Sequence, residues 1–310
     1  MADSPAAEVH IDRALVRALL RDQAPQLAGL PLHEAGAGWD NSMWRLGDAL
    51  GVRLPRREAS APLIVHEQQW LAEIAARVAT ASSVKLPVPL VRGRPGHGYP
   101  WAWSVVLWIE GETALAAESA DRGGSADSGS RADSWAAELA RVIAAIHVPA
   151  PADAPHNPVR GVPLQERATV MSPQFDEAST LWPAETFAAV NQTWNDALDA
   201  APWPGPALWL HGDLHPGNVL VRDGALVGVV DFGDVTSGDP AYDLAVAWAL
   251  FSPAGRAVFR AEFGERYSDA DWVRARGRAA AFAVTLLLRS DDNPAYLALA
   301  HRVAEAIAGE

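Results

Sequence analysis

The 310-residue chain contains no cysteine and only one lysine, Lys85. Without a thiol it can form no disulfide, and it has neither a thiolate nucleophile nor a thiolate metal ligand. No uncharged apolar run reaches the roughly 18 residues that span a bilayer. Residues 1–8 lack the basic and then apolar pattern of a secretory signal. We therefore expect a soluble, cytoplasmic protein with no membrane partner.

The charge balance is acidic, with a net charge of -13. Nucleic-acid-binding surfaces need clustered lysine and arginine, so this balance argues against a nucleic-acid partner. It would help to attract a cationic small molecule, although solubility alone also accounts for it. The length is long for one compact unit, and two lobes are expected.

Two polar motifs follow each other closely, His211-Gly-Asp-Leu-His-Pro-Gly-Asn218 and Val229-Val-Asp-Phe-Gly233. Short β-type runs on either side of the turn Arg222-Asp-Gly224 predict a hairpin between the motifs. That hairpin would bring Asn218 and Asp231 back together.

These residue types suit metal-assisted phosphoryl transfer. The reaction needs a carboxylate that orients and deprotonates the attacking hydroxyl, and oxygen ligands for Mg²⁺ ions that bridge the nucleotide phosphates. Asp213 suits the first role, and Asn218 and Asp231 suit the second. Either short motif alone is more often an ordinary turn, but their combination at this spacing favours catalysis.

The motifs resemble those of the aminoglycoside phosphotransferase family, small-molecule kinases with the protein-kinase fold that include macrolide phosphotransferase-like members. The resemblance covers nearly the whole chain. It extends to Gly38-Trp-Asp-Asn41, to Val52-Arg-Leu-Pro-Arg-Arg57 and to Gly238-Asp-Pro-Ala-Tyr-Asp-Leu-Ala245. It implies that Asp213 is the catalytic base and that Asn218 and Asp231 are the metal ligands.

The resemblance also implies an α+β fold of two lobes. Residues 1–109 would form the nucleotide-binding lobe, a small antiparallel sheet with a helix pair. Residues 110–310 would form the larger, mainly α-helical lobe for catalysis and acceptor binding. ATP or GTP would be the phosphoryl donor, with Mg²⁺ as cofactor.

The strand that carries Arg53 usually carries a phosphate-binding lysine in kinase-fold enzymes. Lys85 lies too far along the chain to take this place, so Arg53 is the candidate. Because a guanidinium is larger and prefers bidentate partners, the choice between ATP and GTP stays open. Glu67 is the only charge on the apolar face of the next predicted helix, and it should pair with Arg53 unless it reaches solvent.

Two further segments are candidates for nucleotide binding. The turn Gly36-Ala-Gly38 could cover the phosphates, because glycine lets the backbone approach their oxygens, although a plain β-turn fits as well. By resemblance, Leu107-Trp108-Ile109 joins the lobes and offers its backbone to the purine.

The sequence leaves several chemical classes open for the acceptor. An aminoglycoside-type or other cationic antibiotic is favoured, and the alternatives are a macrolide, a sugar or an amino alcohol. A protein kinase is disfavoured by Gly212, because such kinases carry an arginine there. A non-catalytic nucleotide-binding module is disfavoured because all three reactive groups are kept. The oligomeric state stays open.

Three further expectations concern longer segments of the chain. Apolar spacing predicts a helix from about Val9 to Leu20. The Ser-, Gly- and Ala-rich stretch 118–133 predicts a mobile loop. The resemblance implies that residues 149–206 help to form the acceptor site, and Asp291 and Asp292 could give that site acidic groups.

Overall fold

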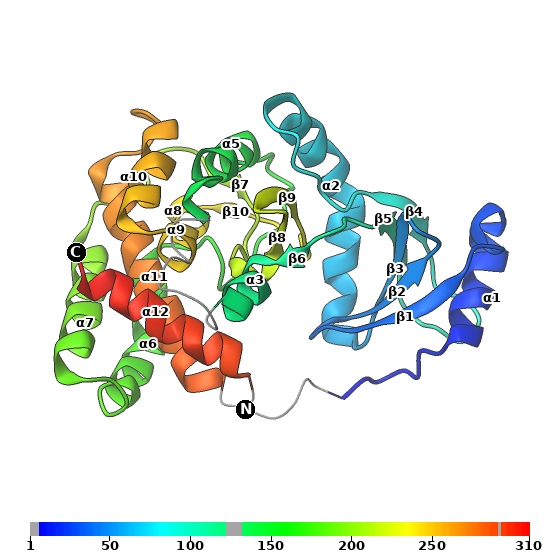
Figure 1. The fold of residues 1–310 in the computed structure, drawn as a ribbon, viewed down its shortest axis with the longest axis horizontal. Coiled ribbons are helices and arrows are strands. Elements are labelled where there is room, and N and C mark those ends of the chain that lie inside the picture. Colours follow the sequence, from blue (N-terminus) through cyan, green and yellow to red (C-terminus); the bar gives the residue numbers. More distant parts are fainter. Residues whose placement is uncertain (1–5, 122–131, 291–292) are drawn as a thin grey trace.

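The computed structural model describes residues 6–121, 132–290 and 293–310, and it has two lobes (Figure 1). The smaller lobe contains an antiparallel sheet of five strands in the order β1-β2-β3-β5-β4. These strands are β1 (Leu32–Ala37), β2 (Asn41–Leu46), β3 (Leu50–Pro55), β4 (Pro89–Gly93) and β5 (Trp103–Leu107). Strands β1 to β3 form a three-stranded meander, and β5 extends it alongside β3.

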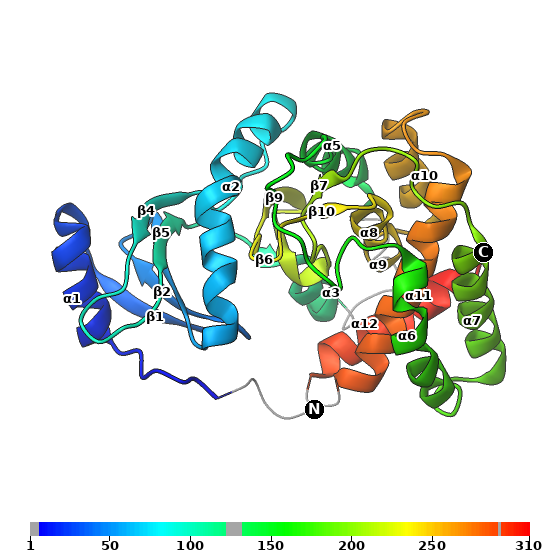
Figure 2. The same cartoon turned by 180° about the vertical axis from the view of Figure 1, so that it is seen from behind.

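Two helices, α1 (Arg13–Gln23) and α2 (Ala61–Ala81), accompany this sheet. Helix α1 lies on the outer side of the lobe, and α2 lies on the side that faces the larger lobe (Figures 1 and 2). The start predicted for α1 was too early. The Asp12 side chain accepts a hydrogen bond from the Leu15 amide at 2.8 Å and so marks the N-cap.

The larger lobe is mainly helical. Its helices are α3 (Ala114–Asp121), α5 (Ala136–Ile146), α6 (Leu164–Ala178), α7 (Ala184–Asp199), α8 (Ala241–Leu244), α9 (Val246–Leu250), α10 (Pro253–Glu262), α11 (Asp269–Arg289) and α12 (Pro294–Ala308). Helix α11 packs against α6, α7, α8 and α12, so it is the centre of the lobe. A Cβ atom at Gly277 would lie 2.1 Å from the Cβ of Ala197, so glycine lets α11 and α7 approach closely.

Short strands hold the two polar motifs in the larger lobe. Strands β6 (Glu112–Thr113), β8 (Val219–Arg222) and β9 (Ala225–Val229) form one sheet, and β7 (Leu208–Leu210) pairs with β10 (Thr236–Gly238). The predicted hairpin is β8 and β9. Its turn residues Asp223 and Gly224 both have positive φ, 54° and 76°, as a type I′ turn requires.

The small sheet and the helical lobe confirm the predicted α+β, protein-kinase-like architecture. The prediction of a loop over 118–133 was wrong at its start, because α3 continues to Asp121. The centre of that stretch, 122–131, lies outside the described residues, as do Asp291 and Asp292. In the described part of the chain, no helix combines the length and the apolar character needed to cross a membrane.

Candidate active site

A buried carboxylate anchors the loop that carries Asp213. Asp243 on α8 is fully buried and accepts hydrogen bonds from the backbone amides of His211, at 2.7 Å, and Gly212, at 3.1 Å. His147 Nε2 lies 3.1 Å from the same carboxylate. Burial alone would raise the pKa of Asp243, but the hydrogen bonds and charges of His147 and His211 outweigh it and hold the pKa below its ordinary value.

Replacing Asp243 should therefore weaken the fold. An Asp243→Asn variant loses a charged acceptor for buried amides, and we expect its free energy of unfolding to fall by about 1–3 kcal/mol at neutral pH. Because the folded pKa is depressed, the carboxylate stabilises above its unfolded pKa of about 3.9 and ceases to do so as the pH falls through the folded value.

Denaturant unfolding of wild type and Asp243→Asn at about pH 7 and about pH 3 measures both effects. The stability difference should be large at the higher pH and smaller at the lower pH. Equal stability of the two proteins at neutral pH would contradict the anchoring role.

His211 and Gly212 shape the same loop. The His211 ring is buried, with Nδ1 3.1 Å from the Asp213 amide and Nε2 3.0 Å from the Val230 carbonyl oxygen. It therefore ties the loop to the end of β9. Gly212 has φ +82°, and a Cβ there would lie 2.2 Å from the Asp234 carbonyl oxygen. A side chain would clash with the Asp234 backbone in this conformation, so the position requires glycine.

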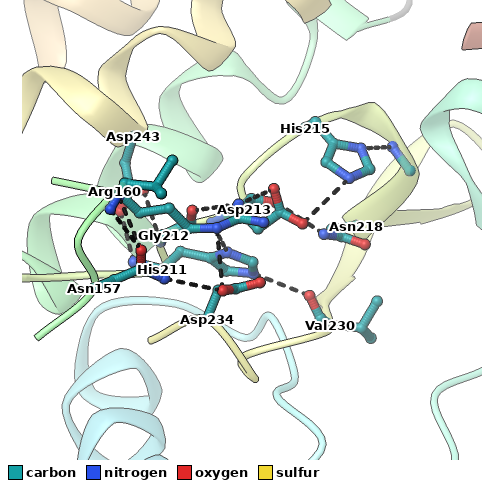
Figure 3. Close-up of polar contacts among 12 residues, drawn as sticks. Asn157, Arg160, His211, Gly212, Asp213, His215, Asn218, Val230, Asp234 and Asp243 are labelled. Atoms are coloured by element: carbon teal, nitrogen blue, oxygen red, sulfur yellow. Dashed lines mark hydrogen bonds and ion pairs between the residues drawn. The ribbon is translucent and has the colours of Figure 1, made fainter. Parts of the chain in front are cut away.

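Asp213 points toward an arginine that the sequence analysis did not identify. The Arg160 guanidinium forms an ion pair with the Asp213 carboxylate and donates to the Gly212 carbonyl oxygen at 2.8 Å. Its Nε lies 3.1 Å from the Asp234 carboxylate, so one cation serves both acidic groups (Figure 3). Burial alone would raise the pKa of Asp213, but the charges of Arg160 and His215 hold it below its ordinary value. Asp213 is thus ionised, as a proton acceptor must be.

The hairpin brings Asn218 and Asp231 together as predicted. The Val230 amide donates to the Asn218 carbonyl oxygen at 2.9 Å. Asn218 Nδ2 donates to the Asp213 carbonyl oxygen at 2.8 Å, which leaves the side-chain oxygen for another partner. Asp231 has φ +64°, and its side chain is half exposed.

This pair of oxygen donors fits a hard cation only in part. Across the described ranges, no group of three or more histidine, cysteine, aspartate or glutamate residues could hold a metal ion. Mg²⁺ commonly takes one or two protein carboxylates and completes its shell with phosphate oxygens and water. Asn218 and Asp231 therefore suit a cation that arrives with a nucleotide.

Arg53 occupies the place predicted for it. Its Nη1 lies 2.7 and 2.8 Å from the two carboxylate oxygens of Glu67, and its Nη2 lies 3.0 Å from Asp231. The predicted ion pair is confirmed, and Glu67, with no exposed surface, does not reach solvent. Burial alone would lower the pKa of Arg53, but the two carboxylates raise it above its ordinary value. The single lysine, Lys85, instead joins β9 through its backbone.

A pocket of about 450 Å³ lies between the sheet of the small lobe and the hairpin of the larger lobe. The predicted residues in its lining are Gly38, Arg53, Leu107, Ile109, Asn218 and Asp231. Glu67 lies behind Arg53 and is not in the lining. Gly36 is also not in the lining. The turn predicted over Gly36-Ala-Gly38 was placed too early, because Gly36 and Ala37 still pair with β2 as part of β1.

A second pocket, also of about 450 Å³, opens on the other side of the Asp213 loop. Its walls come from α6, α7, α11 and the α8–α9 segment, through side chains such as Met171, Trp194, Phe282 and Tyr242. Asp213 lines this pocket, while Asn218 and Asp231 line the first one. The loop and hairpin thus form the boundary between two pockets.

Sequence relatives match short parts of the chain. Aminoglycoside 3'-phosphotransferase from Escherichia coli is 31% identical over 83 residues, which is 26% of this chain and 28% of that protein. The uncharacterized protein YcbJ of Bacillus subtilis is 38% identical over 61 residues, 19% of either chain. The chain therefore spans less than a third of the length of these two curated relatives.

Solved structures match along almost the whole chain. The GDP complex of aminoglycoside 2'-phosphotransferase-IIIa has a TM-score of 0.66 at 16% identity, covering 96% of this chain and 99% of that one. Macrolide 2'-phosphotransferase MphH from Brachybacterium faecium has a TM-score of 0.57 at 20% identity, covering 94% and 97%. At these identities the likeness shows the shared fold.

The model of the phosphotransferase enzyme family matches residues 31–279, well over half of the chain. This range includes the sheet, the pocket between the lobes and every residue predicted for the site, whereas the second pocket extends beyond it along α11 to Arg289. The chain therefore belongs to the phosphotransferase enzyme family.

Proposed function

We propose that the protein transfers the γ-phosphoryl group of ATP or GTP to a hydroxyl of a small molecule. The observation that carries this proposal is the boundary between the pockets. Asp213 lines one pocket, and Asn218 and Asp231 line the other. The Asn218 side-chain amide donates a hydrogen bond to the Asp213 carbonyl oxygen at 2.8 Å. A base for the acceptor thus lies next to oxygen ligands for the donor, as phosphoryl transfer requires.

The nucleotide would occupy the pocket between the lobes. Arg53, held by Glu67, would contact the triphosphate, and the backbone of Gly38 would approach from the β1–β2 turn. Leu107 and Ile109 would frame the base. The GDP complex of aminoglycoside 2'-phosphotransferase-IIIa, which shares this fold, supports a nucleotide donor. We place the boundary of the lobes between residues 109 and 110.

The chemistry follows from Asp213. Its carboxylate would accept the proton of the acceptor hydroxyl as that oxygen forms a bond to the γ-phosphorus. The bond from the γ-phosphorus to the bridging oxygen breaks, and the nucleoside diphosphate leaves. Mg²⁺ bound at Asn218 and Asp231 would neutralise charge on the phosphates. The position of Arg160 keeps Asp213 ionised before the hydroxyl arrives.

The acceptor would bind in the second pocket. Aminoglycosides and macrolides are the first compounds to test, because relatives that share the fold are named for acting on them. Sugars and amino alcohols are the alternative. ATP and GTP are abundant in the cytoplasm, where we place the reaction, and the acidic net charge disfavours a nucleic-acid acceptor.

One incubation series tests the proposal. The protein is mixed with ATP or GTP, Mg²⁺ and a panel of aminoglycosides, macrolides, sugars, amino alcohols and hydroxy acids, and products are identified by mass. We expect one class to gain about 80 Da, with loss of the gain when EDTA removes Mg²⁺. A product carrying the nucleotide, or the same yield with EDTA, would contradict the proposal.

A further inference from the structure

The second pocket carries a charge opposite to that of the whole protein. The charged residues in its lining are four arginines and one aspartate, Arg160, Arg167, Asp213, Arg278 and Arg289. The chain as a whole has a net charge of -13. A cationic lining is therefore a local property of this pocket.

Arg278 on α11 is the most informative of these residues. Only 7% of its surface is exposed. Nη2 donates to the Val162 carbonyl oxygen, and the guanidinium carbon lies 4.9 Å from the centre of the Tyr242 ring. Its buried Nε has no hydrogen-bond partner. Within the ranges that the structure describes, no carboxylate forms an ion pair with Arg278.

The carboxylate that most favours the charged form of Arg278, Asp239, does not compensate for this burial. Asp239 is held by Arg274, whose Nε lies 2.8 Å from its carboxylate. Burial lowers the pKa of Arg278 below its ordinary value, and the charge of Asp239 opposes this shift without cancelling it. A buried cation is costly unless an anion pairs with it. An anionic ligand in the pocket would supply that pair.

The other side chains that line the second pocket indicate which chemical groups its ligand carries. On α11, Arg278, Phe282, Thr285 and Arg289 follow helical spacing and share one face. On α6, Leu164, Arg167, Met171 and Gln174 do the same. Arg278 is buried, whereas Arg289 is exposed at the end of α11. Cationic groups thus alternate with apolar surface.

We infer that the acceptor is a hydroxyl compound with an apolar body and an acidic group, and that Arg278, assisted by Arg167, binds the acidic group while the hydroxyl reaches Asp213. The inference rests on the proposed transfer reaction. It separates the acceptor from polycations such as aminoglycosides, which Arg167, Arg278 and Arg289 would repel. The charge of Arg160 is already taken up by Asp213 and Asp234. A carboxylate and a phosphate monoester share the required chemistry.

The test compares acceptors that differ only in charge. Hydroxy acids, their amides, the corresponding hydroxy amines and the phosphate monoesters are each incubated with protein, Mg²⁺ and ATP or GTP. We expect kcat/KM for the preferred acid to exceed that of its amide by about tenfold to a hundredfold, with the amine lower still. Comparison of kcat/KM between the hydroxy acids and the phosphate monoesters decides which of the two anionic groups the pocket binds.

Variants then test the residue. Arg278→Gln should bring the acid-to-amide ratio of kcat/KM close to one, and Arg289→Gln should lower it less. Arg21→Gln, which removes an exposed arginine from α1, should leave it unchanged. A loss of folded protein lowers kcat/KM for the acid and the amide equally, so it leaves their ratio unchanged. If Arg278→Gln does not fold, the wild-type ratio alone decides whether the acceptor is acidic.

The outcomes separate this inference from the proposed function. Transfer that prefers amines or amides would overturn the acidic acceptor while leaving the phosphotransferase in place. An acid-to-amide ratio that Arg278→Gln leaves at its wild-type value would overturn the role of Arg278. If the protein binds neither nucleotide in the presence of Mg²⁺, the proposed function itself fails.

Discussion

Replacing Asp213 by asparagine should reduce phosphoryl transfer by about 10²- to 10⁴-fold. The amide keeps the size of the side chain but cannot accept the hydroxyl proton. The ion pair with Arg160 would also be lost, and that pair holds the side chain at the mouth of the second pocket. Initial rates of product formation with a saturating acceptor measure the effect.

Nucleotide binding should be retained in the Asp213→Asn variant. Asp213 does not line the pocket between the lobes, so the dissociation constant for the Mg²⁺ complex of ATP or GTP should change little in Asp213→Asn. An Arg222→Gln variant, at the exposed end of β8, serves as the control with wild-type transfer. Undiminished transfer by Asp213→Asn would remove Asp213 from the mechanism.

Replacing Arg53 by methionine should damage both stability and nucleotide binding. The change leaves the fully buried Glu67 without its cation. Breaking a buried ion pair from one side costs about 3–5 kcal/mol, because the remaining charge has no partner. The loss also removes the only cationic side chain that lines the pocket between the lobes in the described residues. Urea unfolding and nucleotide titration measure the two effects.

A double variant separates the two effects. With Arg53→Met and Glu67→Met together, no buried charge remains unpaired, and most of the lost stability should return. Nucleotide affinity should not return, because the phosphates still lack a cation. If the double variant binds ATP and GTP as tightly as wild type, Arg53 does not contact the triphosphate.

The parts of the site that could be predicted depend on short-range sequence relations. Asp213, Asn218 and Asp231 are close in sequence, and a hairpin with an Asp-Gly turn brings the last two together. Arg53 and Glu67 could be paired because helical periodicity places one carboxylate on an apolar face. In both cases local geometry determines the contact.

The parts that could not be predicted depend on packing between distant segments. Arg160 meets Asp213 from a proline-rich segment 53 positions earlier, and no local pattern marks it. The cationic pocket exists only because α6 and α11 pack together. The predicted loop over 118–133 was misjudged at its start, since alanine and glutamate there favour the helix α3.

In the proposed reaction, one site passes the γ-phosphoryl group directly from nucleotide to acceptor across the Asp213 loop. The most direct measurement follows a label on the γ-phosphate of ATP or GTP in wild type and Asp231→Asn. We expect the label to appear on the acceptor hydroxyl with wild type and Mg²⁺, and to be nearly absent with the variant. Equal labelling by both proteins, or a label that never leaves the nucleotide for any acceptor class, would contradict the claim.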